Sequence, residues 1–167
     1  MRKYLCLLLC LSLLFCLFGC SKKAPEVPAE FFYWESNLSN DPQKSVIGSE
    51  IRETASYPGY IRTLDLYLKG PESNALKATF PRGTRIVSLS QAPGSISLVL
   101  SDEFASLTGI ELSIACICLA KTVIQLTGCN DVTVQAETLP LDGEKNITLD
   151  NSGVLFYDNY YGQTESE

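Results

Sequence analysis

The 167-residue sequence predicts an α+β domain, in which a mixed or antiparallel β-sheet carries two main helices on one face. Three observations favour this fold class. Short segments rich in β-branched and aromatic residues recur along the chain, two other segments show the apolar spacing of helices, and Gly- and Pro-containing turns separate them. The predicted order is strand, strand, helix, strand, strand, helix, strand, strand.

The first nineteen residues resemble a bacterial lipoprotein signal peptide. Arg2 and Lys3 form a positive n-region, residues 4–18 form an apolar run, and Gly19 directly precedes Cys20. We expect cleavage between Gly19 and Cys20 and transfer of a diacylglyceryl group to the Cys20 thiol, with palmitate as a typical acyl chain. An uncleaved transmembrane helix is the alternative, but the apolar run is shorter than the usual span. The sequence therefore predicts attachment to the lipid bilayer of the cell membrane on its extracytoplasmic face.

The remaining chain suits one compact domain with short tails. We expect residues 20–30 to form the lipidated cysteine and a flexible tether, residues 31–150 to form the domain, and residues 151–167 to form a tail that can add an edge strand before it frays. The formal net charge is −6, and loss of the signal peptide makes it more negative. Because an acidic surface repels phosphates, we expect no nucleic-acid partner.

The first half of the domain begins with an aromatic strand at 31–34, followed by a turn at 37–44 and a second extended segment at 45–56. From residue 57 the apolar residues recur at spacings of three and four, which predicts a helix. Gly70 and Pro71 end it, because proline cannot continue the helical ladder.

A probable β-hairpin follows the turn at 81–84. Its strands are expected at 85–89 and 96–100, on either side of a turn at 92–95 that contains Pro93 and Gly94. The pattern of strand, short Gly-containing turn and strand is typical of antiparallel pairing.

The second helix has a clear start and end. Thr108 and Glu111 have the spacing of a capping box, and Gly128 follows the last apolar turn. The apolar stripe between them is wider than that of a solvent-facing helix, so we expect a core helix lying across a sheet. Two further strands are predicted at 131–135 and 146–149, around a turn at Asp142–Gly143.

Three cysteines remain after the signal peptide and Cys20. Cys116 and Cys118 lie on opposite sides of the predicted helix, and Cys129 lies about 17 Å along it from Cys118. That separation is too long for a disulfide. We interpret all three as small buried hydrophobic residues rather than as metal ligands, because the chain has no histidine and the spacing matches no zinc pattern.

The middle of the chain resembles a known family. The motifs that carry the resemblance are LDLYLKGPES at Leu64–Ser73, FPRGT at Phe80–Thr84, LSDEF at Leu100–Phe104, KTV at Lys121–Val123, and Asp131–Val132. In this order they resemble the GerMN domain of sporulation and spore-germination lipoproteins, over about residues 31–150.

The resemblance implies a non-enzymatic α/β module, exported and often lipid-anchored in Gram-positive bacteria, that works through protein contacts or ligand binding. The chain departs from the family pattern at Val99, where an acidic residue is common, and at Lys121, where Asn is frequent. A polar site at these positions is therefore not expected. Some relatives carry tandem copies, whereas this chain has room for one.

The composition argues against an enzyme. The chain contains no histidine, the commonest general base. Asp102 and Glu103 are adjacent, so on a loop they point apart, and Ser101 lacks a nucleophile elbow. We expect no catalytic residue, no metal and no cofactor. A histidine-free envelope hydrolase that uses Ser101 or Asp102 is the least favoured alternative.

Two non-catalytic functions remain. The favoured one is an assembly module that docks an exposed strand edge or helix face onto an envelope or sporulation protein. The alternative is capture of a germinant or a cell-wall fragment in a pocket lined by Tyr33, Trp34, Tyr57 and Tyr60, although aromatic residues in a domain of this size more often form the core. An uncovered edge strand favours the first, and a pocket with convergent polar groups favours the second.

Overall fold

The computed structural model describes residues 26–36, 45–55 and 59–152 of the chain. The predicted signal peptide, its cleavage site, Cys20, the turn at 37–44, Tyr57 and the tail from residue 153 lie outside the described residues. The predictions for these segments therefore remain predictions.

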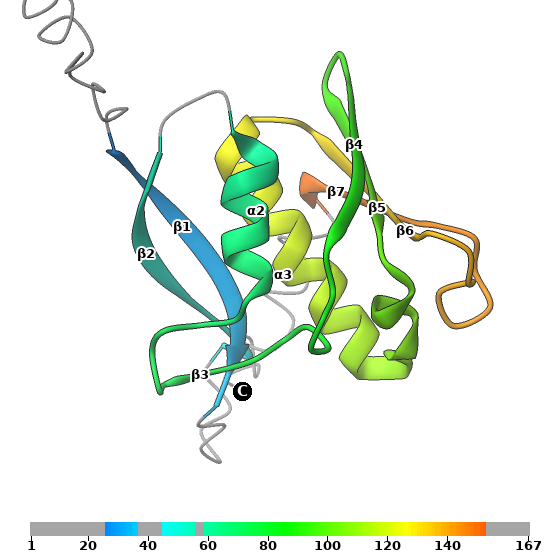
Figure 1. Ribbon diagram of the computed structural model, residues 1–167, viewed down its shortest axis with the longest axis horizontal. Coiled ribbons are helices and arrows are strands. Elements are labelled where there is room, and N and C mark those ends of the chain that lie inside the picture. The colour runs from blue at the N-terminus through cyan, green and yellow to red at the C-terminus, as the bar shows by residue number, and fades with distance from the viewer. Residues whose placement is uncertain (1–25, 37–44, 56–58, 153–167) are drawn as a thin grey trace, which may run out of the picture.

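Two β-sheets lie on opposite sides of a pair of helices (Figure 1). Helix α2 spans Tyr60–Leu68 and helix α3 spans Gly109–Thr127. The α+β class is confirmed, and the predicted order of strands and helices is also found, except that the sequence did not predict the two-residue strand after α2 or the 3-10 helix before α3. The sequence pattern did not reveal that the strands divide into two sheets, because each strand segment shows its own periodicity but not its neighbour.

The first sheet has the strand order β2-β1-β3. Strand β1 (Glu26–Glu35) pairs antiparallel with β2 (Ile47–Ala55) along its full length, and with the short β3 (Leu76–Lys77) at its end. Strand β1 begins five residues before the predicted start of the domain. Residues 26–30 belong to the fold rather than to the tether, because β2 is long enough to pair with them.

The second sheet has the order β4-β5-β6-β7. Strands β4 (Ile86–Ala92) and β5 (Ser95–Leu100) form the predicted antiparallel hairpin, and β6 (Asp131–Ala136) pairs parallel with β5 and antiparallel with β7 (Ile147–Asp150). The parallel pair is joined by a 3-10 helix, η1 (Asp102–Ser106), and by α3. This crossover makes the sheet mixed.

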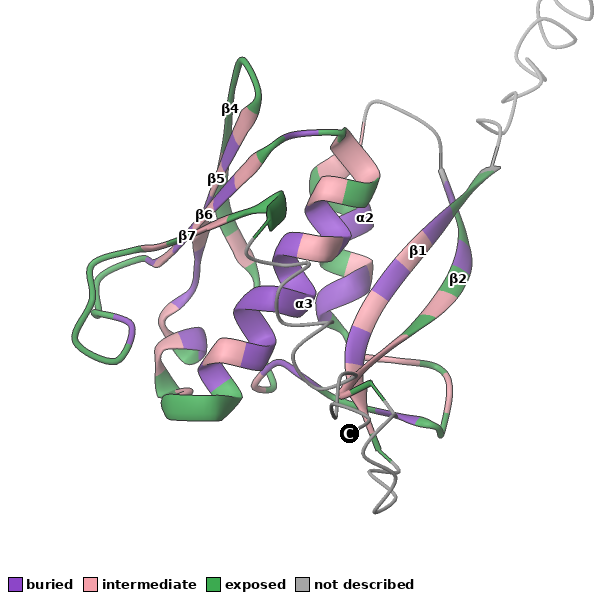
Figure 2. Cartoon of the chain, turned by 180° about the vertical axis from the view of Figure 1, so that it is seen from behind, coloured by how far each residue is buried: buried purple, intermediate pink, exposed green. Residues whose placement is uncertain are grey.

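Helix α3 is buried on nearly all sides because it lies between the two sheets (Figure 2). Within the described residues it is the one helix long and apolar enough to cross a membrane, and more than half of its apolar window is buried inside the domain. The width of its apolar stripe therefore reflects two packed faces. Alternate residues of β5 and β6 are buried, as expected for strands with one face on the core.

The two ends of α3 were predicted with different success. Gly128 ends the helix as expected, with a φ of 69°, in the left-handed conformation that favours glycine. The predicted capping box is wrong, because the Thr108 side chain makes no capping hydrogen bond. The Gly109 N–H instead donates to Asp142 Oδ2 at 3.1 Å, so a carboxylate from the distant turn takes the role expected of a local pair.

Candidate functional site

The residues first considered for catalysis have structural partners. Ser101 is buried, and its Oγ accepts the Arg85 N–H at 3.2 Å. Asp102 accepts the N–H groups of Thr138 and Leu139 at 2.8 and 3.1 Å, and these bonds, with the Thr138 hydroxyl first, lower the pKa of Asp102. Asp102 thereby fastens η1 to the loop after β6.

Glu103 points elsewhere. Its carboxylate lies 3.7 Å from the Arg85 guanidinium at the surface. The predicted divergence of Asp102 and Glu103 is confirmed, since each binds a different segment. Ser101 and Glu103 both contact Arg85, and a hydrogen bond with the Ser101 side chain is the main cause that lowers the pKa of Glu103, whereas Asp102 binds the loop after β6.

The three cysteines of the domain are buried and form no disulfide among the described residues, as predicted. Burial raises the pKa of Cys116 to about 12, so its thiol is protonated at neutral pH. Within the described residues, no group of three or more cysteines and carboxylates could hold a metal ion. The cysteines serve as packing residues around α3.

The aromatic residues proposed for a ligand pocket are not brought together. Tyr33 is fully buried in the core, where its hydroxyl donates to the Tyr67 carbonyl at 2.8 Å. Trp34 lies on the other face of β1, with Lys77 Nζ 4.3 Å from the centre of its ring. Tyr60 lies at the start of α2 and lines a cavity there. The predicted aromatic pocket is therefore not formed by the described members of the set.

A buried ion pair that the sequence did not single out lies beside the core aromatic residues. Arg52 on β2 forms an ion pair with Glu50, donates to the Gly70 carbonyl at 2.6 Å, and packs over the Phe31 ring at 5.3 Å. Glu50 accepts the N–H groups of Glu72 and Ser73. The pair fastens the loop after α2 to strand β2.

Two opposing effects act on Glu50. Burial raises its pKa, but the Arg52 hydrogen bond and the loop N–H groups outweigh burial and lower it overall. Every partner of this pair belongs to the fold, so the cluster has the character of a structural clamp. The sequence did contain a signal for this pair. Glu50 and Arg52 are two positions apart in a predicted strand, so their opposite charges lie on the same face of it.

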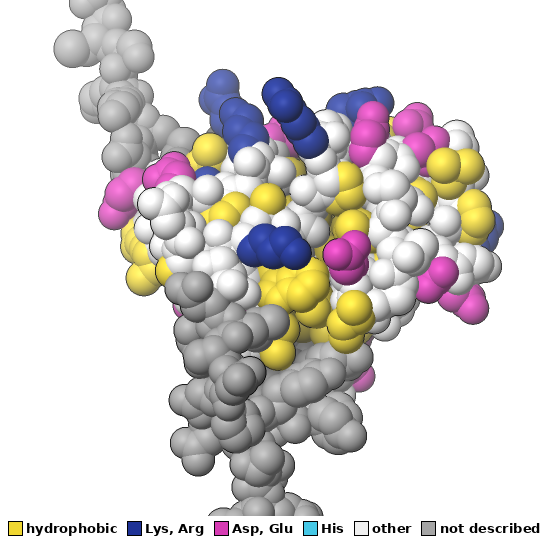
Figure 3. Space-filling model, turned by 90° about the horizontal axis from the view of Figure 1, so that it is seen from below, with side chains coloured by type: hydrophobic (Ala, Val, Ile, Leu, Met, Phe, Trp, Pro, Cys, Tyr) yellow, Lys and Arg dark blue, Asp and Glu magenta, His cyan; other side chains and the backbone are white. Residues whose placement is uncertain are grey.

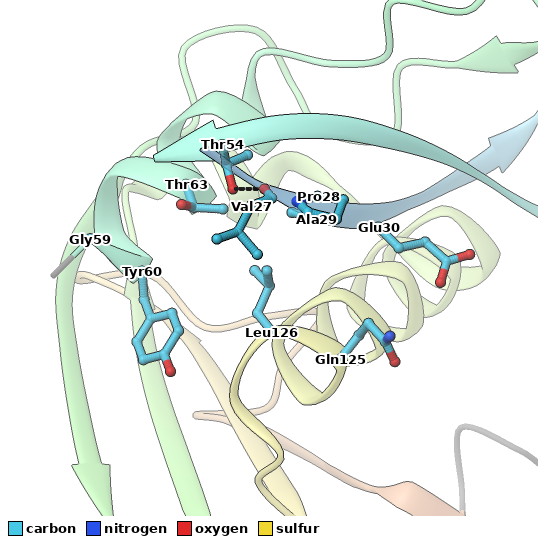
Figure 4. A pocket seen from close by; sticks show the side chains of 10 residues that line it. All are labelled: Val27, Pro28, Ala29, Glu30, Thr54, Gly59, Tyr60, Thr63, Gln125 and Leu126. Atoms are coloured by element: carbon cyan, nitrogen blue, oxygen red, sulfur yellow. Dashed lines mark hydrogen bonds between the residues drawn. The ribbon is translucent and has the colours of Figure 1, made fainter. Parts of the chain in front are cut away.

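One cavity of about 290 Å³ lies between β1, the start of α2 and the end of α3. In Figure 4 the apolar side chains of Val27 and Leu126 point toward one another, whereas the polar ends of Tyr60, Glu30 and Gln125 point in different directions. The cavity is small and is lined by both apolar and polar side chains. It lacks the convergent polar groups that orient a specific ligand.

A second cavity, of about 320 Å³, separates α3 from the turn before β7. Its lining is largely apolar, with Leu112, Ile117 and Leu141 among its walls, and Asp142 and Glu144 also line it. Ser113, the Cys116 thiol and the two carboxylates of the turn are its polar or ionisable groups, and one of these carboxylates, that of Asp142, already caps α3.

Apolar and basic groups adjoin on one face of the molecule. Figure 3 shows hydrophobic side chains gathered near the centre of the view from below, with a basic and an acidic side chain directly beside them. Besides the Lys77–Trp34 contact, Lys121 Nζ lies 4.8 Å from the centre of the Phe32 ring. These lysines cover aromatic surface with their stems, which makes the exposed apolar area smaller than the sequence suggests.

Strand β4 is an outer strand with mostly exposed residues. It forms an edge of the four-stranded sheet, with β5 as its one strand neighbour among the described residues. Its sequence, IVSLSQA, contains no charge and no proline. Most of its residues are exposed, including Val87 at 41%, while Leu89 is partly buried against the core.

The unprotected character of β4 is unusual for an edge. Proteins normally block exposed edges with charged residues, proline or strong bulges, since an open row of N–H and C=O groups pairs with other strands. The outer strand of the other sheet, β2, follows this practice and carries Glu50, Arg52 and Glu53. Strand β4 has one register shift, between Ile86 and Ser88, and is otherwise regular.

Comparison with known proteins gives a fold and no family assignment by sequence. No protein-family model matches the chain, and no curated protein matches it. The solved structure of the tandem GerMN domains of the sporulation protein GerM from Bacillus subtilis is similar, with a TM-score of 0.57 and 14% identity over 78% of this chain and 47% of that one. The first GerMN domain of the same protein gives a TM-score of 0.52 and 14% identity, over 71% of this chain and 91% of that one.

The chain therefore spans about half the length of the tandem GerMN structure. The predicted GerMN-like resemblance is confirmed as a similarity of fold. At 14% identity, the comparison shows a similar fold and does not show that this chain has the function of GerM.

Proposed function

We propose that this chain is an extracytoplasmic lipoprotein, anchored to the cell membrane through a diacylglyceryl group on Cys20, whose domain is a non-catalytic assembly module linked to sporulation or germination. The observation that carries the proposal is the open, uncharged edge of β4 on a GerMN-like fold. Strand addition to such an edge is a common mode of protein binding.

The position of the groups that could do chemistry supports a role without catalysis. Asp102 binds the loop after β6, Ser101 and Glu103 both contact Arg85, and Glu50 and Arg52 bind each other and a loop, so each of these groups has a partner within the domain. A hydrolase would need at least two such groups to face one bound substrate. The alternative of a histidine-free envelope hydrolase is therefore disfavoured.

The link to sporulation or germination rests on the fold, since the similar structures come from a sporulation protein. A strain that lacks this chain should produce fewer heat-resistant spores or spores that germinate more slowly. Normal numbers of normally germinating spores would contradict this part of the proposal and leave the assembly role to be judged separately.

The assembly role is tested by photo-crosslinking of the full chain in its own membranes. A photoreactive amino acid replaces Gln91 on the β4 edge, and a matched variant carries it at Ser49, on β2, the outer strand of the other sheet. We expect a discrete crosslinked protein band from position 91 and little from position 49. Equal or absent crosslinking at both positions would contradict docking through β4.

The small-ligand alternative is favoured by the cavity near Tyr60, which has the volume of a small molecule. It predicts that one germinant or cell-wall fragment raises the thermal unfolding midpoint of the protein and that Leu126→Trp, which fills the cavity, abolishes the effect. If this result appeared without a crosslink from position 91, the ligand-binding function would replace assembly.

A further inference from the structure

We propose that strand β4 pairs antiparallel with β4 of a second copy of this chain, with Leu89 of one copy opposite Leu89 of the other. This inference rests on the proposed assembly function and identifies the partner as a second copy. It joins the two four-stranded sheets into one continuous sheet across a two-fold axis.

The turn of the hairpin fixes which backbone groups are available. Pro93 and Gly94 form a two-residue turn, so Ala92 and Ser95 close the hairpin as a hydrogen-bonded pair. Because hydrogen bonding alternates along an antiparallel pair, Ser90 and Ser88 also bond to β5, whereas the N–H and C=O groups of Leu89 and Gln91 point away from it. Leu89 is therefore at the centre of the open edge.

The sequence of β4 is complementary to itself in this register. With Leu89 opposite Leu89, Ser88 of each copy lies opposite Ser90 of the other, and Val87 lies opposite Gln91. Paired serine hydroxyls hydrogen-bond across strands, and no charge opposes a like charge. The two Leu89 side chains, each already packed on the core, extend that core across the interface.

The same pairing would not suit β2, the outer strand of the other sheet. Strand β2 carries three charged residues, Glu50, Arg52 and Glu53. Two of them, Arg52 and Glu50, form a buried ion pair with each other. Of the two long outer strands, β2 and β4, only β4 has no charged residue; the remaining outer strands, β3 and β7, have two and four residues.

The two-fold arrangement is compatible with two anchors in one bilayer. The β1–β2 pair lies on the opposite side of the helices from the β4–β7 sheet (Figures 1 and 2). A two-fold axis perpendicular to the β4–β7 sheet therefore places both β1–β2 pairs on the same side. Since β1 begins at Glu26, six positions after Cys20, both points at which the proposed anchors join the folded domains then lie on that side.

The area of contact predicts a weak dimer in dilute solution. Stable complexes bury about 1,200–2,000 Å², and one added strand pair of seven residues lies at or below this range. Attachment to a common membrane raises the effective concentration of the two copies.

The test uses two differently tagged copies of the full chain expressed together, with co-precipitation from solubilised membranes as the measurement. Wild-type copies should co-precipitate. Ser88→Lys with Ser90→Lys places lysines opposite lysines and should reduce co-precipitation about tenfold or more. One copy with S88K and S90K, mixed with a copy carrying S88E and S90E, should restore it.

The matched control carries Ser49→Lys and Ile51→Lys, which place two lysines at the same spacing on β2. It should co-precipitate like wild type, and the thermal unfolding midpoint should show that every variant folds. The proposal is overturned if wild-type copies do not associate, if the double-lysine variant associates normally, or if the lysine and glutamate copies fail to restore association. If the proposal is overturned in this way but a different protein crosslinks from position 91, the assembly function still holds. The partner is then that protein and not a second copy of this chain.

Discussion

Three hydroxyl groups close the edge of β1 that lies away from β2. The Phe32 N–H donates to Thr122 Oγ1 at 3.1 Å, and the Trp34 N–H donates to Thr79 Oγ1 at 2.9 Å. The Tyr67 hydroxyl donates to the Phe32 carbonyl at 2.7 Å. Side chains thus satisfy backbone groups that a neighbouring strand would otherwise bind, which gives the central threonine of α3 a structural role.

Replacement of Thr122 by Val should therefore destabilise the domain. The variant leaves the Phe32 N–H without its acceptor inside the protein, which costs about 1–3 kcal/mol. Urea denaturation measures the difference, and Thr122→Ser is the control because it keeps the hydroxyl. If the valine variant is as stable as the serine variant, the hydrogen bond has no role in closing the edge.

The Glu50–Arg52 pair makes stability depend on pH. The folded-state pKa of Glu50 lies below its ordinary value of 4.5. The carboxylate therefore contributes stability that is fully present above about pH 4.5 and is lost as the pH falls through the folded-state pKa. The loop that contains Glu72 and Ser73 should loosen over the same range, because Glu50 accepts its N–H groups.

A Glu50→Gln variant should be less stable at pH 7 by about 1–3 kcal/mol, and its stability should fall less steeply than that of wild type below pH 4.5. Chemical denaturation at a series of pH values measures both effects. Glu53→Gln, on an exposed neighbour in β2, is the control. Parallel pH profiles for the Glu50→Gln variant and wild type would show that this carboxylate is not responsible.

At the level of elements, α3 is positioned by its two ends. Asp142, from the turn before β7, binds the first turn at Gly109, and Gly128 reverses the chain toward β6. Asp142 itself has a positive φ of 51° and precedes Gly143, so the turn that was predicted from its sequence also supplies the cap. The helix is held by the β6–β7 hairpin as well as by packing.

Gly128→Ala should destabilise the protein by about 1–2 kcal/mol, since an L-residue in the left-handed conformation is strained. No atom lies within 4 Å of the added Cβ, so the effect isolates backbone strain from crowding. Thermal unfolding measures it, and Gly128→Asn, which tolerates this conformation better, should lose less. An alanine variant as stable as wild type would show that the backbone relaxes there without cost.

For the whole molecule, the start of β1 limits how far the domain can stand from the proposed anchor. Glu26 is paired with Ala55, so five residues separate Cys20 from the sheet. Fully extended, that connection spans about 20 Å, less than the tether of residues 21–30 would allow. If Cys20 is lipidated, any partner of the domain lies close to the bilayer.

Cys20→Ala should abolish incorporation of labelled palmitate and leave an uncleaved precursor, because the lipid is attached before the signal is removed in lipoproteins of this kind. Gel mobility and autoradiography of membrane fractions measure both. Cys129→Ala, which removes a buried free thiol, should be labelled like wild type. Unchanged labelling and processing of the Cys20→Ala variant would reject the anchor.

Local chemistry in the sequence determined most elements. Gly70 and Gly128 end the two helices, the Pro93–Gly94 turn joins β4 to β5, and the three domain cysteines are buried. Each prediction succeeded because the deciding interaction lies within a few residues along the chain: a positive φ, a missing N–H or an apolar period.

Only the tertiary structure decided which distant groups meet. It replaced the Thr108–Glu111 capping box with Asp142 and, within the described residues, left β4 with β5 as its one strand neighbour. The physical reason is that a hydrogen bond to a residue more than thirty positions away, or the absence of a neighbouring strand, depends on how the sheets pack around α3, and no local pattern in the chain encodes that packing.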